Sequence, residues 1–255
     1  MERRRAIPQE HPFLYTEAMR LHKYIANCGY TARRRAELLI QAGRVTVNGR
    51  LVTSLGTTVD PAKDEVIMNG EVVLPSEAIT IMLNKPAEII TSTHDTHDRL
   101  TVMDLLPRRL VNQGILPAGR LDLDTEGLLV LSNNGDLSHR ITHPRYETEK
   151  EYDALVSGTP TSSGLRKFET GIRLEGEMTS PARIESVKPE KKSTRVRVVI
   201  REGKKRQVRR MFESIGNKVI HLKRVRIGNL LLGNLPRGEW RELEEKEIQG
   251  LMGEG

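Results

Sequence analysis

The first regular pattern of apolar and polar positions predicts two short helices between residues 19 and 43. In the first, apolar residues recur at helical spacing and Gly29 follows as a stop; they are Leu21, Tyr24, Ile25 and Cys28. The second has Thr31 as its expected N-cap and an apolar stripe of Ala32, Ala36, Leu39 and Ile40. Arginines 33–35 stand near its start, where the helix dipole disfavours positive charge, so we expect an anionic ligand nearby.

Two similar segments follow, VNGRLV at residues 47–52 and MNGEVV at residues 68–73. Asn-Gly within alternating apolar positions is the strongest short-range indicator of a two-residue β-hairpin. The segments therefore predict one small α+β module over residues 19–73, and not a solenoid repeat. Residues 74–78 are typical of a linker. Residues 1–18, which are basic and lack the apolar core of a secretory signal, are expected to form a flexible arm.

Beyond residue 79, apolar runs alternate with turn-forming residues as strands do. The runs are ITIMLNKP, LLVLSNNGD, EYDALVSG, TRVRVVIREG and RVRIGNLLLG. They predict a larger β-rich domain over residues 79–249, built on a mostly antiparallel mixed sheet with flanking helices, and a tail at 250–255. The predicted fold class is therefore α+β, with a small and a large domain.

One clear helical pattern lies inside this larger domain. Apolar residues recur at i, i+3, i+4 and i+7 before Gly216; they are Val208, Met211, Phe212 and Ile215. Arg209 lies on the flank of this stripe, so it can project from the edge of the core into a cleft.

The charge is unevenly distributed. The chain has 41 Lys and Arg against 34 Asp and Glu, a net charge of +7. Residues 20–50 contain one acid, Glu37, and residues 191–210 contain one acid, Glu202, among many Lys and Arg. A solvated face kept for solubility would interleave acids, so these two blocks favour contact with a polyanion, most commonly nucleic acid.

Cysteine content and hydropathy exclude other classes. A single cysteine, Cys28, excludes an internal disulfide and a thiolate zinc cluster, which fits a reducing cytoplasm. No apolar run approaches the roughly 18 residues that a membrane span needs. We therefore expect a cytoplasmic protein that does not associate with membranes.

A carboxylate-rich stretch, PAGRLDLDTEGLLVLSNNGD at residues 117–136, allows three interpretations: a calcium loop, a surface turn or a catalytic carboxylate. Asp122, Asp124 and Glu126 match the first half of an EF-hand loop. However, the twelfth position is Asn133, and the apolar run LLVL occupies the loop, so calcium is excluded. Asp122 and Asp124 could share one face of a strand, but their spacing does not decide which of them is reactive.

Other cofactor motifs are incomplete. The histidines of HDTHD at 94–98, and His139 with His143, lack the adjacent glutamate of an H-E-x-x-H zinc motif. GNLLLG at 228–233 lacks the lysine of a P-loop, and no G-x-G-x-x-G occurs. We expect neither a metal nor a cofactor.

Taken together, these motifs resemble the RsuA/RluB-type family of ribosomal RNA pseudouridine synthases. GRLDLDTEGLLVLSNNGDLSHRITHP at 119–144 carries the family's G-R-L-D-x-x-T-x-G-L-L motif. The supporting blocks, in the family's order, are LNKP, TVMDLLP, EKEY, EGKKRQVRRMFESIGNKV, LKRVRIGNLLL and LPRGEW. The N-terminal module resembles the S4 RNA-binding domain, and together the blocks span about residues 19–249.

The resemblance implies a reaction without cofactors. Asp122 matches the family's essential aspartate, which acts on a uridine flipped out of the RNA stack, either by attacking the ribose or by removing a ribose proton. Tyr152 matches the tyrosine that stacks on the base, and Arg209 a basic residue expected to pair with Asp122. Arg120 matches an arginine that supports RNA near the flipped base; a salt bridge with Asp124 is the alternative.

The implied partner is ribosomal RNA within precursor ribosomal particles, bound by a monomer. Further RNA contacts are expected from Lys23, Arg33, Arg34, Arg35 and Arg44 in the small module and from Lys204, Lys205 and Arg206 in the catalytic cleft. LPRGEW favours the large-subunit 23S RNA, with 16S RNA as the alternative. A binding factor without catalysis is a further alternative, but it would need none of Asp122, Tyr152 and Arg209.

One position departs from the family pattern. Members commonly have Lys-Pro-x-Gly after the first strand of the catalytic domain, whereas LNKPAE places Glu88 at the glycine. The sequence therefore leaves the shape of this loop and its RNA contact undecided, whereas the catalytic motif is unaffected.

Overall fold

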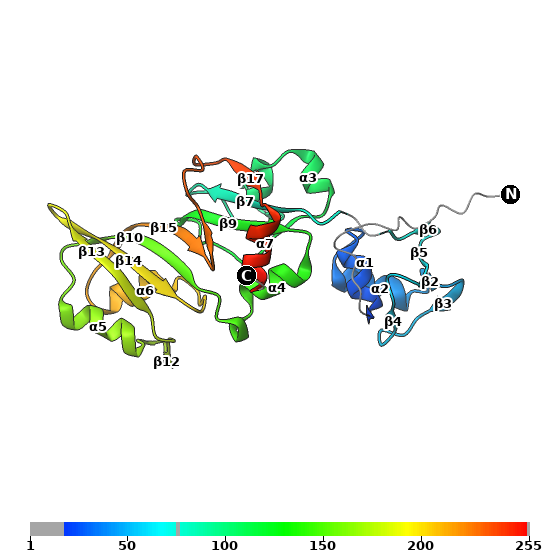
Figure 1. The fold of residues 1–255 in the computed structure, drawn as a ribbon, viewed down its shortest axis with the longest axis horizontal. Coiled ribbons are helices and arrows are strands. Elements are labelled where there is room, and N and C mark those ends of the chain that lie inside the picture. The colour runs from blue at the N-terminus through cyan, green and yellow to red at the C-terminus, as the bar shows by residue number, and fades with distance from the viewer. Residues whose placement is uncertain (1–17, 75–76, 254–255) are drawn as a thin grey trace. The chain divides into compact units, whose positions relative to one another are not determined.

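The structure, a computed structural model, describes residues 18–74 and 77–253 (Figure 1). The chain divides into two compact units. The first ends at Ile79 and also takes in Asn112–Ile115, and the second comprises the remaining residues from Thr80. Most of the expected arm, and parts of the expected linker and tail, lie outside the described residues.

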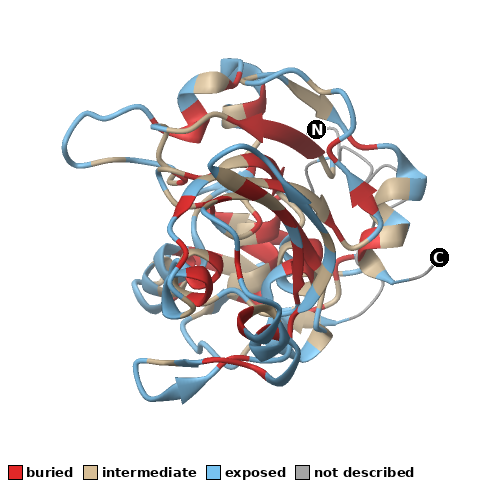
Figure 2. Ribbon diagram, turned by 90° about the vertical axis from the view of Figure 1, so that its left-hand side faces the viewer, coloured by how far each residue is buried: buried red, intermediate tan, exposed pale blue. Residues whose placement is uncertain are grey.

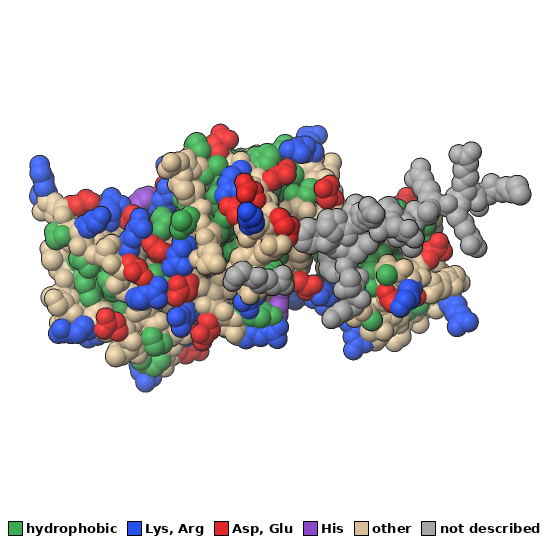
Figure 3. Space-filling view, in the orientation of Figure 1, with side chains coloured by type: hydrophobic (Ala, Val, Ile, Leu, Met, Phe, Trp, Pro, Cys, Tyr) green, Lys and Arg blue, Asp and Glu red, His purple; other side chains and the backbone are tan. Residues whose placement is uncertain are grey.

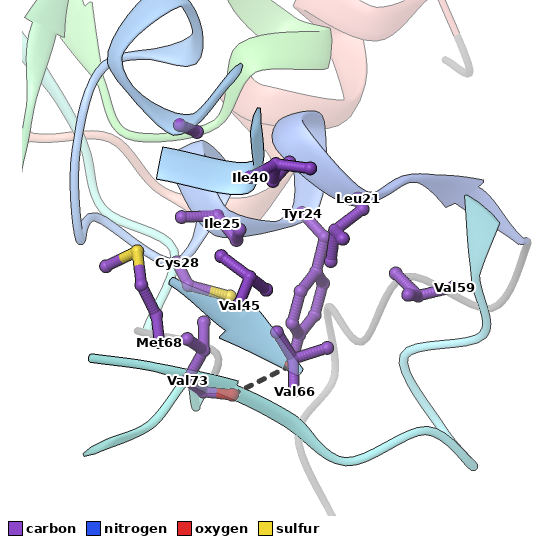
Figure 4. Close-up of a cluster of buried hydrophobic side chains, with 11 residues drawn as sticks. Leu21, Tyr24, Ile25, Cys28, Ile40, Val45, Val59, Val66, Met68 and Val73 are labelled. Atoms are coloured by element: carbon purple, nitrogen blue, oxygen red, sulfur yellow. Dashed lines mark hydrogen bonds between the residues drawn. The ribbon is translucent and has the colours of Figure 1, made fainter. Parts of the chain in front are cut away.

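The first unit combines two helices with a four-stranded antiparallel sheet in the order β3-β2-β5-β6. The helices are α1 (Leu21–Asn27) and α2 (Arg33–Gln41). The strands of the sheet are β2 (Val45–Val47), β3 (Arg50–Val52), β5 (Val66–Met68) and β6 (Glu71–Val72). A separate pair is formed by β1 (Met19–Arg20) and β4 (Thr58–Val59). Helices and sheet enclose one apolar core, in which the Tyr24 hydroxyl donates a hydrogen bond to the carbonyl of Val73 (Figure 4).

Both predicted Asn-Gly hairpins are confirmed. Asn48 and Gly49 have φ of 51° and 76°, and Asn69 and Gly70 have φ of 52° and 87°. Positive φ at both central residues is the geometry of the hairpin turn that Asn-Gly favours. The predicted N-cap of α2 is wrong: Ala32 takes that position, and it makes no side-chain cap hydrogen bond.

The second unit is built on a nine-stranded mixed sheet, which confirms the predicted architecture. Seven strands follow the order β13-β14-β10-β15-β9-β7-β17, with β16 paired to β15 and β8 to β9. All neighbours are antiparallel except β9 and β15. The strands are β7 (Thr80–Lys85), β8 (Leu116–Pro117), β9 (Glu126–Ser132), β10 (Lys150–Ser157), β13 (Arg183–Pro189), β14 (Ser193–Ile200), β15 (Val219–Ile227), β16 (Leu230–Leu231) and β17 (Trp240–Glu242). A separate hairpin joins β11 (Arg173–Leu174) and β12 (Glu177–Met178).

Five α-helices and two short 3₁₀ helices accompany the described part of this sheet. They are α3 (Arg108–Asn112), α4 (Gly135–Thr142), α5 (Ser162–Thr170), α6 (Gln207–Ser214), α7 (Glu245–Met252), η1 (Val102–Leu105) and η2 (Pro144–Tyr146). The pattern at 208–215 predicted α6, whose Phe212 packs on Phe168 of α5 with ring centroids 4.9 Å apart. Helix α7 continues past the expected end of the domain at residue 249, and its Leu251 is buried in the core.

Buried residues concentrate on the strands of the sheet, while exposed residues lie mainly in the loops (Figure 2). On one side, β7, β9 and β15 share a core with α4 and α7, in which Met82, Leu128, Val130 and Leu137 are buried. This packing fixes β9, the strand that follows the carboxylate-rich turn.

Ion pairs link the strands of the larger unit and neutralise part of the second basic block. Arg195 pairs with Asp153 of β10 at 3.0 Å and Arg197 with Glu151 of β10 at 3.1 Å. Arg201 pairs with Glu149 at 3.4 Å. Lys and Arg side chains are accordingly interspersed with Asp and Glu on the face in Figure 3. The block is less free to bind a polyanion than its local sequence suggests.

Candidate active site

Asp122 lies in the turn between β8 and β9. The turn is closed by a hydrogen bond from the amide of Thr125 to the carbonyl of Asp122 at 3.1 Å, and β9 begins only at Glu126. Asp122 and Asp124 therefore do not share the face of a strand, and their surroundings differ.

Asp124 is occupied by two arginines. Arg206 donates to both of its carboxylate oxygens at 2.8 and 2.9 Å, and Arg209 Nε lies 3.3 Å from Oδ2. Arg209 Nη2 also donates to the backbone carbonyl of Asp124 at 2.6 Å. Hydrogen bonding from Arg206 holds the pKa of the Asp124 carboxyl below its usual range. Asp124 is thus a charge-balancing residue of the turn.

The predicted direct pair between Arg209 and Asp122 is not formed; Arg209 contacts Asp124 instead. Arg209 lies at the start of α6 and also donates to the carbonyl of Val219 at 3.3 Å. It therefore ties α6 to the turn and holds the backbone that carries Asp122. The alternative salt bridge of Arg120 with Asp124 is not found either, because the ion-pair partners of Asp124 among residues 18–74 and 77–253 are Arg206 and Arg209.

The carboxylate of Asp122 has no hydrogen-bond or ion-pair partner among the described residues. It lines a cavity of about 450 Å³, within the roughly 300–1,000 Å³ typical of small-molecule pockets. Basic residues outnumber acidic ones in the lining, which contains Arg120, Lys150, Lys204, Lys205, Arg206 and Arg224 against Asp122 and Glu202. A basic cavity with one unpaired carboxylate suits a negatively charged substrate.

Tyr152 forms part of the cavity wall. It lies on β10, is 8% exposed and pairs in register with Arg224 of β15. Arg224 Nη1 lies 3.5 Å from the Tyr152 hydroxyl. Tyr152 is therefore both a buried aromatic residue of the core and part of the cavity wall.

Lys85 fixes the turn that carries Asp122 by hydrogen bonds to its backbone. This lysine of β7 is fully buried, and its ammonium donates to the carbonyls of Pro86 at 2.8 Å and Thr125 at 3.0 Å. The carbonyl of Asp122 lies 3.3 Å away. Burial lowers the pKa of Lys85 to about 8, against the opposing effect of nearby carboxylates.

Two further contacts from the segment after β7 fix the same turn. The amide of Glu88 donates to the carbonyl of Leu123 at 2.8 Å, and the Thr91 hydroxyl donates to the carbonyl of Leu121 at 2.9 Å. Glu88 has φ of 65°, the left-handed conformation that a glycine adopts most easily. The loop therefore takes the backbone conformation that glycine favours despite the glutamate.

The sequence did not single out four polar residues of this site: Lys85, Thr125, Lys150 and Arg224. Each belongs to a motif block, and each is at most 9% exposed. For the lysines and the arginine, the sequence offered one indication of a functional role, which is a single cation inside an apolar strand. Lysine and arginine are rarely buried without partners. Burial, and next the charge of Arg224, lowers the pKa of Lys150 to about 8.

The basic residues of the first unit lie on its helices and first strand. Arginines 33–35 form the first turn of α2 and are exposed, as is Arg44 before β2, whereas Lys23 on α1 is half-buried. Arg33 contacts His22 at 3.1 Å. An uncapped helix start with three exposed arginines remains consistent with the expected anionic ligand.

Comparison with known proteins gives the family. The sequence profile of the family described as RNA pseudouridylate synthase matches residues 79–214, and that of the S4 domain matches residues 19–66. The chain is 43% identical over 234 residues to the ribosomal large subunit pseudouridine synthase B of Bacillus subtilis, covering 91% of this chain and 95% of that protein. It is 36% identical over 238 residues to the dual-specificity RNA pseudouridine synthase RluF of Escherichia coli, covering 92% of this chain and 79% of RluF.

A crystal structure of a pseudouridylate synthase, 34% identical, superposes with a TM-score of 0.66 and covers 91% of this chain and 99% of that one. The chain therefore belongs to the RNA pseudouridylate synthase family, with an S4 domain at its N-terminal side. This confirms the predicted family and the predicted enzyme class, an isomerase.

No helix among the described residues is long and apolar enough to cross a membrane. Within residues 18–74 and 77–253, no three His, Cys, Asp or Glu side chains form a group that could hold a metal ion.

Proposed function

We propose that the protein converts a specific uridine of ribosomal RNA to pseudouridine, with Asp122 as the catalytic carboxylate. The observation that carries this proposal is the contrast within one turn. Asp124 is neutralised by Arg206 and Arg209, whereas Asp122 presents an unpaired carboxylate to the basic cavity among the described residues. Spacing alone left these two residues equivalent.

The geometry supports a role for each predicted residue. A uridine flipped out of the RNA would enter the cavity, at a cost of a few kcal/mol that is lowest in an unpaired loop. Tyr152 would form the wall against which the base rests, and Asp122 would act at the ribose, as nucleophile or as base. Arg209 would act through the backbone of Asp124, as a positioning residue of the turn.

Four basic residues of the cavity lining support binding of the RNA backbone. They are Arg120, Lys204, Lys205 and Arg206. Lys204 is also paired with Glu177 at 3.1 Å and Arg206 with Asp124, so their free charge is reduced. We infer that Arg120 and Lys205 contribute most to phosphate binding here, while Lys204 and Arg206 shape the cavity.

For the RNA itself, we propose the 23S RNA of the large subunit, bound by a monomer in the cytoplasm during ribosome assembly. The relative of 43% identity carries a large-subunit name, whereas RluF is called dual-specific. The S4 unit would bind rRNA through Lys23, Arg33, Arg34, Arg35 and Arg44.

The test is to map pseudouridines in 23S and 16S RNA from cells with and without the gene. Loss of one 23S pseudouridine, restored by the wild-type gene and not by one encoding Asp122→Asn, is the expected result. Loss of a 16S site instead would favour the small-subunit alternative. An unchanged map would favour a binding factor without catalysis.

A further inference from the structure

Two residues of the cavity lining each carry a buried polar side-chain atom that has no hydrogen-bond partner among the described residues. The atoms are Nη2 of Arg224 and Oγ1 of Thr125. The residues are only 4% and 2% exposed. An unpaired polar atom in such a buried place costs about 1–3 kcal/mol, so a pair of them on residues that line one cavity points to a ligand that satisfies both.

The backbone holds these two residues together. Gly127 of β9 lies opposite Arg224 in the parallel pair of β9 and β15, and Thr125 precedes Gly127 by two residues. A Cβ on Gly127 would lie 2.2 Å from the carbonyl oxygen of Arg224, so only glycine permits this approach. Arg224 Nε donates to the carbonyl of Leu128 at 2.7 Å, which leaves Nη2 as the free end of a fixed guanidinium.

The neighbours of Arg224 are the residues expected at the base. Its Nη1 lies 3.5 Å from the Tyr152 hydroxyl, and Asp122 and Lys150 line the same cavity. Arg224 therefore lies beside Tyr152, the residue against which the uracil ring would rest. Uracil offers two carbonyl oxygens as acceptors and one N–H as a donor, which matches an arginine and a hydroxyl.

We propose that Arg224 and Thr125 form the uracil subsite, in which Arg224 Nη2 donates to a carbonyl oxygen of the flipped base and Thr125 Oγ1 hydrogen-bonds the same edge. The proposal rests on the proposed function and adds residues to it. Because the guanidinium carries a positive charge, Arg224 also has a part in the chemistry.

The role of Arg224 in the reaction follows from the movement of electrons when the glycosidic bond breaks. When the bond between N1 and C1′ breaks, its electron pair stays on N1, and the uracil anion spreads the charge over O2 and O4. C5 then bonds to C1′, C5 loses its proton and N1 gains one, so uridine and pseudouridine are isomers and nothing is oxidised. A fixed cation at a carbonyl oxygen stabilises the anion more than the neutral base, whichever way Asp122 acts.

The test compares Arg224→Met, Thr125→Val and the control Arg226→Met in single-turnover reactions with an rRNA fragment carrying the mapped uridine. Arg226 lies on the same strand but pairs with Glu149 and Glu151 outside the cavity lining. Arg224→Met should slow detachment of the base about 100- to 1,000-fold, the usual loss for one such donor, with RNA affinity within about threefold. Thr125→Val should slow it about tenfold without lowering the Tm, because an unpaired buried hydroxyl is replaced by a methyl group.

A second substrate separates a chemical role from a structural one. With 5-fluorouridine at the target, the fluorine already stabilises the anion, so the loss in Arg224→Met should be smaller than with uridine. An equal loss with both substrates, or a rate within threefold of wild type, would overturn the proposal. If Arg224→Met does not fold, the same comparison of the two substrates with Arg224→Lys and Thr125→Val tests the proposal. The control Arg226→Met should lower the Tm and leave the rate of the folded enzyme unchanged.

Binding of free uracil tests the uracil subsite separately from the proposed function. Wild type should bind uracil in titration calorimetry, and Arg224→Met and Thr125→Val should bind it at least tenfold more weakly. If wild type modifies no ribosomal RNA but shows this pattern, the substrate assignment fails and the subsite stands. If all three bind uracil equally, the subsite is wrong even when rRNA is modified.

Discussion

At the scale of single residues, Lys85 is the least expected member of the site. A lysine with no exposed surface is rare, and this one directs its ammonium at backbone carbonyls of the turn that carries Asp122. It has no carboxylate within ion-pair distance in the described structure. Its charge is therefore used to hold a backbone conformation.

The lowered pKa of Lys85, about 8, predicts how activity and stability depend on pH. Activity should fall as the pH rises through about 8, because a neutral amine donates fewer and weaker hydrogen bonds to the turn. Stability should respond in the opposite sense. Between pH 8 and 10.5 the unfolded chain keeps a proton that the folded chain has lost, so this residue's contribution to the free energy of unfolding rises with pH.

Single-turnover rates between pH 6.5 and 9.5 check this prediction. Lys85→Met should be slower than wild type at pH 7 and should lack the decline near pH 8. Lys150 has a similar pKa and lines the cavity, so Lys150→Met is the matched control. If the decline disappears in Lys150→Met and persists in Lys85→Met, the account of Lys85 is wrong.

Prediction from sequence worked unevenly at this scale. Asp122 was chosen by family resemblance, while its distinction from Asp124 appears only in the structure, because it depends on Arg206, 82 residues further along the chain. The same separation explains the incorrect partner of Arg209. The second basic block seemed free of acids because its ion-pair partners, such as Asp153 and Glu151, lie on a different strand.

At the scale of elements, the parallel pair of β9 and β15 positions the site. It is the only parallel contact in the described sheet, and it requires Gly127 at φ 102° with the Arg224 backbone against it. Local patterns predicted both strands but could not predict their pairing, since register depends on residues far apart in the sequence.

Gly127→Ala should destabilise the protein by more than about 4 kcal/mol, because its Cβ would overlap the Arg224 backbone. Gly70→Ala is the control: its φ of 87° is similar, but nothing lies within 4 Å of the added Cβ. It should cost only about 1–2 kcal/mol of backbone strain. Denaturant unfolding measures both, and equal losses would contradict the assignment of close packing at Gly127.

Glu88 gives a second prediction for the loop after β7. Its left-handed conformation costs roughly 1–2 kcal/mol, and Glu88→Gly removes that strain while giving the unfolded chain more freedom. We expect a stability change within about 1 kcal/mol and unchanged activity. Glu88→Val, which disfavours positive φ strongly, should lower both activity and Tm through the contact with Leu123. Full activity of Glu88→Val would show that this contact does not matter.

Helices were predicted less completely than strands at this scale. Helix α6 has a full apolar stripe and was found. The start of helix α4 was not recognised in the sequence because SNNGD also fits a turn. Strand β9 ends at Ser132, and Asn134 caps the helix by accepting from the amides of Asp136 and Leu137.

At the scale of the whole molecule, the two units have separate cores, and each was largely predictable. The S4 unit follows from helical spacing and two Asn-Gly turns, both of which are local features. The order of strands in the catalytic sheet is not local, so it became predictable only through family resemblance.

Removal of residues 1–73 should weaken binding to rRNA while the remaining unit still melts cooperatively, because the apolar cluster around Met82, Leu128 and Leu137 contains no residue of the first unit. If about five phosphates are neutralised, log affinity of the full chain should fall against log salt with a slope of roughly −4. Replacing arginines 33–35 by glutamine should lower the magnitude of this slope, whereas Lys63→Gln, at an exposed pair with Asp60, should not. Affinity that is independent of salt would contradict an electrostatic role for this unit.

The most direct test of the central claim is pseudouridine formation by Asp122→Asn and Asp124→Asn on the same rRNA fragment. Asp122→Asn should form no detectable pseudouridine, while its RNA affinity should stay within about twofold of that of wild type. Asp124→Asn should keep measurable but slower turnover, because it loosens Arg206 and Arg209 without removing the reactive carboxylate. Turnover by Asp122→Asn close to that of wild type, or complete loss confined to Asp124→Asn, would contradict the assignment.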